Sequence, residues 1–149
     1  MKKKNFKIAA AAPQIGIFKK VIAIGYPQFI RNFWGMIGPV EFQVLINPEI
    51  TYFSKEMIKA PELCLSVNGY EGYINRPKVV KVKALNPEGK VVEFEAGGQF
   101  ARCIQHEIDH LDGILFVDRI EDIRDLRKIE YVSENDPVLA FNKNFNKNK

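Results

Sequence analysis

The sequence predicts a single α+β domain, in which antiparallel strands pack around a central helix. Its 149 residues fit one domain of ordinary size, and 46% of them are hydrophobic, which is enough for one core. Segments with the two-residue period of a strand come first, and segments with the period of a helix come late. The sequence has no internal repeat and no linker, so we expect residues 1–149 to form one domain.

The clearest strand prediction is a hairpin. Residues 80–84 alternate apolar side chains with lysine, the pattern of a strand with one buried face. The sequence Asn-Pro-Glu-Gly at 86–89 has the composition of a turn, and residues 91–94 then return as the partner strand. Shorter strands are expected at residues 21–24, 42–46 and 115–117, the second of them ending at Asn47-Pro48. Residues 29–40 show no clear period and predict a loop.

The main helix is expected between the glycines at 97–98 and Gly113. At about 100° per residue, one arc of about 80° collects four apolar side chains, those of Phe100, Ile104, Ile108 and Leu111. The opposite side is polar and is expected to face water; its side chains are Arg102, Gln105, Asp109 and Asp112. A second, charged helix is expected at residues 121–131, and the tail at 142–149, nearly all Asn and Lys, is expected to be disordered.

Charge and composition exclude several classes of protein. The net charge is +4, but six positive charges are lysines near the two ends, so the rest of the chain does not predict sequence-specific nucleic-acid binding. No apolar run approaches the roughly 20 residues of a membrane span. The apolar part of residues 1–12 is too short for a signal peptide. Two cysteines do not make a disulfide framework, and we therefore expect a cytoplasmic protein.

The most informative stretch is His-Glu-Ile-Asp-His at 106–110, which contains both histidines of the chain. Side chains four residues apart lie on one side of a helix, so His106 and His110 can bind one metal ion together. Glu107 cannot easily join them, but it can reach a water on the ion. The alternative is a core helix with two hydrogen-bonded histidines; this spacing with a glutamate in the second position favours the metal site.

A third protein ligand is expected, and the residues alone leave its identity open. The longer metzincin motif would need a histidine at 116, where Phe116 stands instead. Cys103 lies about 10 Å along the helix axis from His110, so it is expected to be a small buried side chain rather than a ligand. Cys64 is far away in sequence and can arrive from another element, and a carboxylate ligand is the remaining alternative.

Three segments, taken in order, resemble the motifs of the peptide deformylase family. That family carries Gly-x-Gly-x-Ala-Ala-x-Gln, then Glu-Gly-Cys-Leu-Ser, then His-Glu-x-Asp-His. The third motif is complete at 106–110, the second appears as Glu-Leu-Cys-Leu-Ser at 62–66, and the first appears as Ala-Ala-Pro-Gln at 11–14. The resemblance covers residues 9–120 and supplies a cysteine where the metal lacks a ligand.

The resemblance implies a metal-dependent hydrolase that removes the N-formyl group from formyl-methionyl nascent peptides. Cys64, His106 and His110 would hold one divalent ion, with a water in the fourth position. Fe²⁺ is the ion the family commonly uses, and Zn²⁺, Ni²⁺ or Co²⁺ are alternatives that these ligand types do not separate. The expected partner is the N-formylmethionyl peptide, with the ribosome as a further candidate.

The resemblance also implies three catalytic groups. Glu107 would take a proton from the attacking water and hand it to the leaving amine. The side-chain amide of Gln14 and the backbone N–H of Leu65 would hold the developing oxyanion. The alternative for Gln14 is an ordinary polar residue of a loop.

The chain departs from the family pattern in three places. Lys7 and Ala9 replace the two glycines of the first motif, which predicts strain if the backbone has a positive φ there. Leu63 replaces the glycine before Cys64, and its side chain is expected to crowd the substrate or to re-aim the thiol. Residues 1–6 also stand where the family has a leading segment and a helix, which predicts a repacked core or lower stability.

Two other functions remain as alternatives. A non-enzymatic deformylase-like protein would keep the metal for folding and would have lost turnover through Leu63 and the missing leading segment. Another metallohydrolase, such as a peptidase or an amidase, would use the same motif on a different substrate. Among the residues around the motif, Glu62 either pairs with Arg76 or is solvated. Asp109 is expected to be a surface residue of the helix, with a support role as the alternative.

Overall fold

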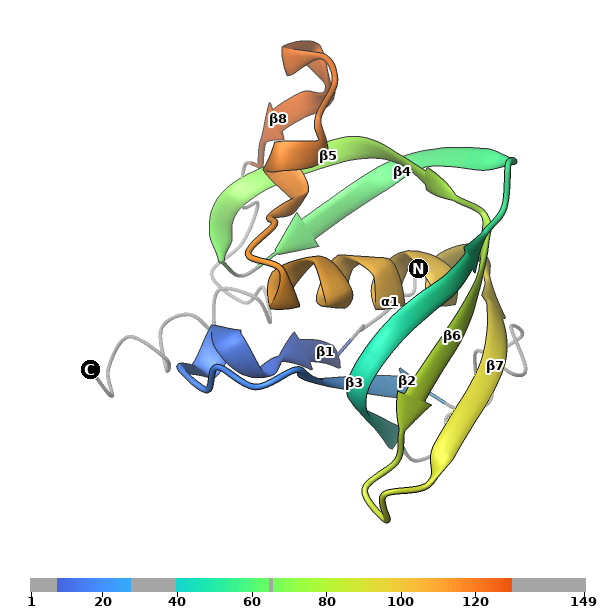
Figure 1. The fold of residues 1–149 in the computed structure, drawn as a ribbon. Coiled ribbons are helices and arrows are strands. Elements are labelled where there is room, and N and C mark those ends of the chain that lie inside the picture. The colour runs from blue at the N-terminus through green and yellow to red at the C-terminus, as the bar shows by residue number, and fades with distance from the viewer. Residues whose placement is uncertain (1–7, 28–39, 65, 130–149) are drawn as a thin grey trace.

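The computed structural model describes residues 8–27, 40–64 and 66–129, and in this part of the chain the main helix lies between two antiparallel sheets (Figure 1). The larger sheet has five strands in the order β1-β2-β3-β6-β7, and the smaller sheet has three in the order β4-β5-β8. The strands are β1 Ile8–Ala11, β2 Val21–Pro27, β3 Val40–Phe53, β4 Met57–Cys64, β5 Val67–Pro77, β6 Val79–Leu85, β7 Val91–Gly97 and β8 Leu126–Lys128. The helices are α1 Gly98–Leu111 and the 3-10 helices η1 Ala12–Ile15, η3 Phe116–Arg119 and η4 Ile123–Asp125. The α+β class, with strands around one main helix, agrees with the prediction.

The predicted hairpin is present as β6 and β7. Its alternating strand turns Val80, Val82 and Ala84 into the core, while the lysines between them are exposed. The turn is closed by Asn86, whose side-chain oxygen accepts hydrogen bonds from two backbone N–H groups of the turn. Because a turn of this kind fixes the register of its two strands, the hairpin forms from local information alone.

Strand β3 continues through Asn47-Pro48, so the strand end predicted there is wrong. The pairing of β3 with β6 shifts register between Ile46 and Glu49, and Asn47 has a positive φ of 49°. A proline is tolerated at such an irregularity, because it has no backbone N–H to offer the ladder. The irregularity lies where β3 exchanges its neighbour: residues 40–46 pair with β2, and residues 46–53 pair with β6.

The predicted apolar side of α1 packs on the larger sheet. Ala101 and Ile104 are completely buried, in one cluster with Ile22 of β2 and with Val80 and Val82 of β6. The other apolar side chains of the helix lie at the edge of this cluster and are half-buried; they are Phe100, Ile108 and Leu111. This contact is the hydrophobic core of the described chain, and it fixes the helix on the sheet.

The polar side of α1 is also buried, and the prediction that it faces water is wrong for three of its four side chains. Arg102, Gln105 and Asp109 are buried, and only Asp112 at the end of the helix is exposed. The reason is the smaller sheet, which covers this side of the helix (Figure 1). Glu62 is the only fully buried residue of β4, so the alternation of that strand gives little sign of a buried face.

The last described segments also differ from the prediction. The strand expected at 115–117 is replaced by η3, and the helix expected at 121–131 is replaced, over its described part, by η4 and by β8, which pairs with β5. The loop predicted at 29–40 falls on residues that lie outside the described ones, except for Val40 in β3, and the tail at 142–149 lies outside them entirely. Among the described residues, no helix has the length and apolar character to span a membrane.

Candidate metal centre

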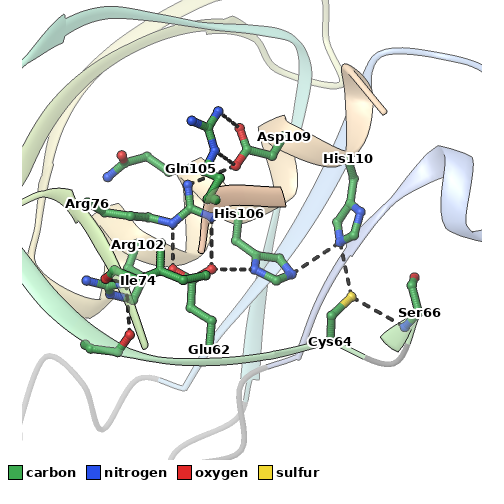
Figure 2. Close-up of polar contacts among 12 residues, drawn as sticks. Glu62, Cys64, Ser66, Ile74, Arg76, Arg102, Gln105, His106, Asp109 and His110 are labelled. Carbon is green, nitrogen blue, oxygen red and sulfur yellow. Dashed lines mark hydrogen bonds and ion pairs between the residues drawn. The ribbon is translucent and has the colours of Figure 1, made fainter. Parts of the chain in front are cut away.

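Three side chains with metal-binding atoms meet where the end of β4 faces α1 (Figure 2). The Sγ atom of Cys64 lies 3.3 Å from Nε2 of His110, and that nitrogen lies 3.2 Å from Nε2 of His106. The three atoms all lie within 4.8 Å of one another. The helix places the two imidazoles on one side because they are four residues apart. The thiol comes from the smaller sheet, because Cys64 is the last residue of β4.

This set of donors fits a divalent metal ion. A thiolate and two imidazoles leave one position open at a tetrahedral ion, which is the arrangement of catalytic rather than structural sites. Within the described residues it is the one group of three His, Cys, Asp or Glu side chains whose donor atoms converge in this way. The ligand role of Cys64, His106 and His110 is still a prediction, but its geometrical requirement is met.

The electrostatics of the group favour the thiolate form of Cys64. Burial alone would raise the pKa of the Cys64 thiol, but hydrogen bonds from His106, His110 and Ser66 outweigh burial and lower it to about 5. Burial alone would lower the pKa of His106, but its hydrogen bonds to Cys64 and Glu62 raise it to about 9. The site therefore stabilises a thiolate next to positive charge, the state in which sulfur binds metals.

Glu107 is buried beside the imidazoles, and its environment is that of a proton carrier. Burial raises the pKa of its carboxyl group to about 7, although the charges of His106 and His110 act in the opposite direction. Its Oε2 atom is buried and has no hydrogen-bond partner among the described residues. An unpaired buried oxygen costs on the order of 1–3 kcal/mol, so this oxygen calls for a partner that the described residues do not supply. A carboxyl group that titrates near neutral pH can both accept and donate a proton.

Glu62 holds the ring of His106 in place through a hydrogen bond to Nδ1. The Nδ1–H group of His106 donates to Oε1 of Glu62 at 2.8 Å, which leaves Nε2 directed toward Cys64. Arg76 grips the same carboxylate with two hydrogen bonds, of 2.6 and 2.9 Å, and Arg102 donates a third, of 2.7 Å. Burial alone would raise the pKa of Glu62, but its bonds to His106 and Arg76 lower it to about 2. Of the two alternatives for Glu62, pairing with Arg76 is the one found.

Gln14 lies at the edge of the group, with its amide oriented by the backbone. Its Oε1 atom accepts a hydrogen bond of 2.8 Å from the N–H of Ala11, so its Nε2 faces the site. That nitrogen lies 3.7 Å from Sγ of Cys64 and donates to Oγ of Ser66 at 3.3 Å. The orientation suits a donor to a substrate oxygen. Leu65, the predicted source of the second donor, lies outside the described residues.

The structure also locates the residues that the sequence had raised as alternatives or departures. Cys103 packs beside the apolar core, away from the three converging donors. Leu63, one residue before the thiol, is 58% exposed, and the crowding of a substrate by its side chain stays a prediction. Ala9 lies in β1, and Asn47 is the only non-glycine residue of the described chain with a positive φ. The strain predicted at Ala9 is therefore absent, and Lys7 lies outside the described residues.

Two supporting residues were missed by sequence reasoning: Arg102 was assigned to a water-facing side, and Arg119 was not singled out. Asp109 was also assigned to that side, and its alternative, a support role, is the one found. Asp109 is buried and accepts two hydrogen bonds from Arg119, of 2.6 and 2.7 Å, and one of 2.9 Å from Arg76. One signal for these residues was available in the sequence. Histidines that bind a metal usually have hydrogen-bonded supporting residues, so polar side chains on the same helix were candidates for that role.

Comparisons with known proteins agree with this geometry. The family model for polypeptide deformylase matches residues 1–125. A peptide deformylase of Natranaerobius thermophilus is 50% identical over 116 residues, which cover 78% of this chain and 67% of the relative. The crystal structure of a peptide deformylase from Synechococcus elongatus in complex with actinonin has a TM-score of 0.68 and 38% identity, covering 79% of this chain and 58% of that one.

A third relative is a Met-Ala-Ser-bound class I type b peptide deformylase from Acinetobacter baumannii, with a TM-score of 0.65 and 42% identity. It covers 76% of this chain, which in turn spans 70% of that structure. The family match extends over most of the chain, and the segments that build the three-donor group lie inside it. The chain belongs to the peptide deformylase family.

Proposed function

We propose that this chain is a hydrolase that removes the N-formyl group from formyl-methionyl nascent peptides. One observation carries the proposal: in a chain of this family, a thiol and two imidazoles converge beside a buried carboxyl group, one oxygen of which has no hydrogen-bond partner among the described residues. Water adds to the formyl carbon, the bond from that carbon to the amide nitrogen breaks, and the nitrogen takes up a proton. The products are formate and a peptide with a free amino terminus.

Cys64, His106 and His110 would hold the divalent ion, because their donor atoms are the ones that converge. When bound, such an ion acts as a Lewis acid that makes a water molecule nucleophilic near neutral pH. Fe²⁺ is our first choice and Zn²⁺, Ni²⁺ and Co²⁺ are the alternatives, since a set of two nitrogens and one sulfur is acceptable to all of them. Glu62 supports the site by holding His106 in the tautomer whose Nε2 faces the ion.

Glu107 would move the proton. Burial raises the pKa of its carboxyl group, which favours a group that can take up a proton and release it again. It would accept the proton of the attacking water and pass it to the departing amine. Gln14 would donate from Nε2 to the formyl oxygen as negative charge develops there, and the N–H of Leu65 would be the second donor. Losing one such donor typically lowers the rate by about 10²–10³.

The proposed substrate is a peptide that begins with N-formylmethionine. The Met-Ala-Ser peptide bound to the Acinetobacter relative has the sequence that such a substrate would have after deformylation. We place the reaction in the cytoplasm, where nascent chains emerge, and regard the ribosome as a candidate partner. The alternative is a non-enzymatic deformylase-like protein that keeps the metal and has lost turnover through Leu63, which is 58% exposed one residue before Cys64.

The test is formate release from formyl-Met-Ala-Ser by protein loaded in turn with Fe²⁺, Ni²⁺ and Co²⁺, with bound metal measured on the same samples. One metal per chain with formate release is expected. One metal per chain without formate release would instead support the non-enzymatic alternative. Failure to bind any of the ions would overturn the proposed site. Formyl-Leu-Ala-Ser and acetyl-Met-Ala-Ser serve as controls for the side chain and for the acyl group.

A further inference from the structure

The 3-10 helix η3, which follows α1, is linked to His106 in two ways, one direct and one through other side chains. The ring of Phe116 is stacked beside that of His106, with ring centroids 6.3 Å apart and planes at 20°. Phe116 is only 1% exposed, and it lies against Gly72 of β5, where a Cβ atom would come within 2.9 Å of the ring. Phe116 is therefore a rigid apolar neighbour of the imidazole.

The second link is indirect. It is a continuous line of hydrogen bonds between charged side chains, most of which Figure 2 shows. It begins at Arg119 of η3, which donates to both oxygens of Asp109. Asp109 is shared with Arg76, whose guanidinium also grips Glu62, and Glu62 accepts from Nδ1 of His106. The side chains between the two ends of this line are buried. They can therefore keep their geometry only while every partner stays in place.

Arg119 supplies two of the three hydrogen bonds that Asp109 accepts. Without them, Asp109 would have only Arg76 to neutralise its charge, and the guanidinium would be drawn toward Asp109. The same guanidinium provides two of the three arginine bonds that hold Glu62. A shift of Arg76 would therefore move the carboxylate that orients His106.

We propose that Arg119 is a positioning residue for the metal site: through Asp109, Arg76 and Glu62 it fixes the direction in which His106 presents Nε2. The inference rests on the proposed function, since it assigns His106 as a metal ligand. It assigns no contact with substrate to Arg119. Partners that orient metal ligands in this way commonly change metal affinity by about 10–100-fold when they are removed.

The chain offers a matched control for Arg119. Arg124 also makes a two-pronged ion pair with an aspartate, Asp122, and also follows α1 in the sequence. Its side chain is 87% exposed, and neither residue of the pair belongs to the line that ends at His106. The side chain of Arg119 is 43% exposed, so its removal does not open a hole in the core. Neither substitution therefore removes a side chain of the apolar core.

The experiment uses the full chain loaded with Co²⁺ and compares Arg119→Met, Arg119→Lys and Arg124→Met with the unmodified protein. Two quantities are measured: the rate at which excess EDTA removes Co²⁺, and the visible absorption spectrum, which reports on the ligand geometry of the ion. We expect Arg119→Met to release Co²⁺ at least about 10-fold faster and to show shifted ligand-field bands. Arg119→Lys should fall between, because an ammonium cannot donate two parallel bonds to a carboxylate. Arg124→Met should match the unmodified protein.

The outcomes separate this inference from the proposed function. If the unmodified chain binds Co²⁺ tightly and Arg119→Met releases it at the same rate with the same spectrum, the positioning role is overturned while the metal site stands. Equal acceleration in Arg119→Met and Arg124→Met would also overturn it, because the effect would then be a general loosening of the segment after α1. If the unmodified chain binds no Co²⁺, the proposed metal site is overturned as well.

Discussion

The two sides of α1 are both buried, but they are held by different interactions. The side that faces the larger sheet is apolar, with Ile104 packed among valine and isoleucine side chains of β2 and β6. The side that faces the smaller sheet is charged, with Arg102 and Asp109 in hydrogen-bonded pairs. Apolar contacts are non-directional and contribute stability, whereas charged hydrogen bonds demand particular directions. The comparison indicates that the larger sheet holds the helix in place and the smaller sheet aims its side chains.

The largest effect is expected at Glu107, next to the converging donors. Glu107→Gln should lower kcat by about 10²–10⁴, because an amide of the same shape cannot take up and release the proton. The metal should still bind at one ion per chain, since Glu107 is not among the converging ligand atoms. Formate release and metal content are measured on one preparation, with Glu93→Gln on exposed β7 as the matched control. Unchanged turnover would remove Glu107 from the mechanism.

The next effect tests the charged side of the helix directly. Glu62→Gln should weaken metal binding by about 10–100-fold, because the partner of His106 Nδ1 loses its charge. It should also lower the free energy of unfolding by about 3–5 kcal/mol, since Arg76 and Arg102 would keep their charges without their shared carboxylate. Competition with a chelator measures the first quantity, and denaturant unfolding of metal-free protein measures the second. The control is Glu56→Gln, which removes an exposed ion pair with Lys78.

On the apolar side of α1, the same reasoning predicts a loss of stability without a change in the direction of the metal-site side chains. Ile104→Ala should lower the free energy of unfolding by about 2–5 kcal/mol, because it leaves a cavity against the larger sheet. The visible spectrum of the Co²⁺-loaded folded protein should stay as it is in the unmodified chain. Ile123→Ala, at an exposed isoleucine, should change stability by less than about 0.5 kcal/mol. A changed spectrum in Ile104→Ala would show that the two sides of the helix do not act separately.

The smallest effect is expected at Leu63, a residue of β4 that belongs to neither of the two sides of α1. Leu63→Gly should cost about 0.5–1 kcal/mol of stability, because glycine weakens a strand. Turnover should change little, since Leu63 is exposed and is not among the converging ligand residues. Steady-state rates on formyl-Met-Ala-Ser make the comparison, with Leu63→Ala as the reference. A large gain of turnover in the glycine variant would show that Leu63 blocks the site after all.

What the sequence could predict depended on local patterns. The hairpin of β6 and β7 has its alternation and its turn within one short stretch, and the helix has its apolar period and its histidine spacing within another. The family resemblance then proposed Cys64 as the third ligand, which spacing alone had left open. Each of these features depends on neighbours in the sequence or on a motif of consecutive residues.

The misses have a common physical reason. Arg102 and Asp109 read as a solvated helix side because the residues that neutralise them lie on other elements: Arg102 meets Glu62, 40 positions away, and Asp109 meets Arg76, 33 positions away. A helical wheel contains no information about such partners. The continuation of β3 through Asn47-Pro48 was missed for a related reason. A proline within a run of strand residues usually argues against a continuous strand, because it cannot donate to the ladder. Here it lies where β3 changes from pairing with β2 to pairing with β6, and a proline is tolerated at such an irregularity.

The position of Cys64 at the end of β4 has a consequence for folding. A cation bound by this thiol and by His110 would join two points 46 residues apart in the chain, and thereby tie a strand of one sheet to the helix that rests on the other. An ion that binds the folded chain and not the unfolded one draws the equilibrium toward the folded chain by mass action. Metal supply would then set the lifetime of the protein as well as its activity.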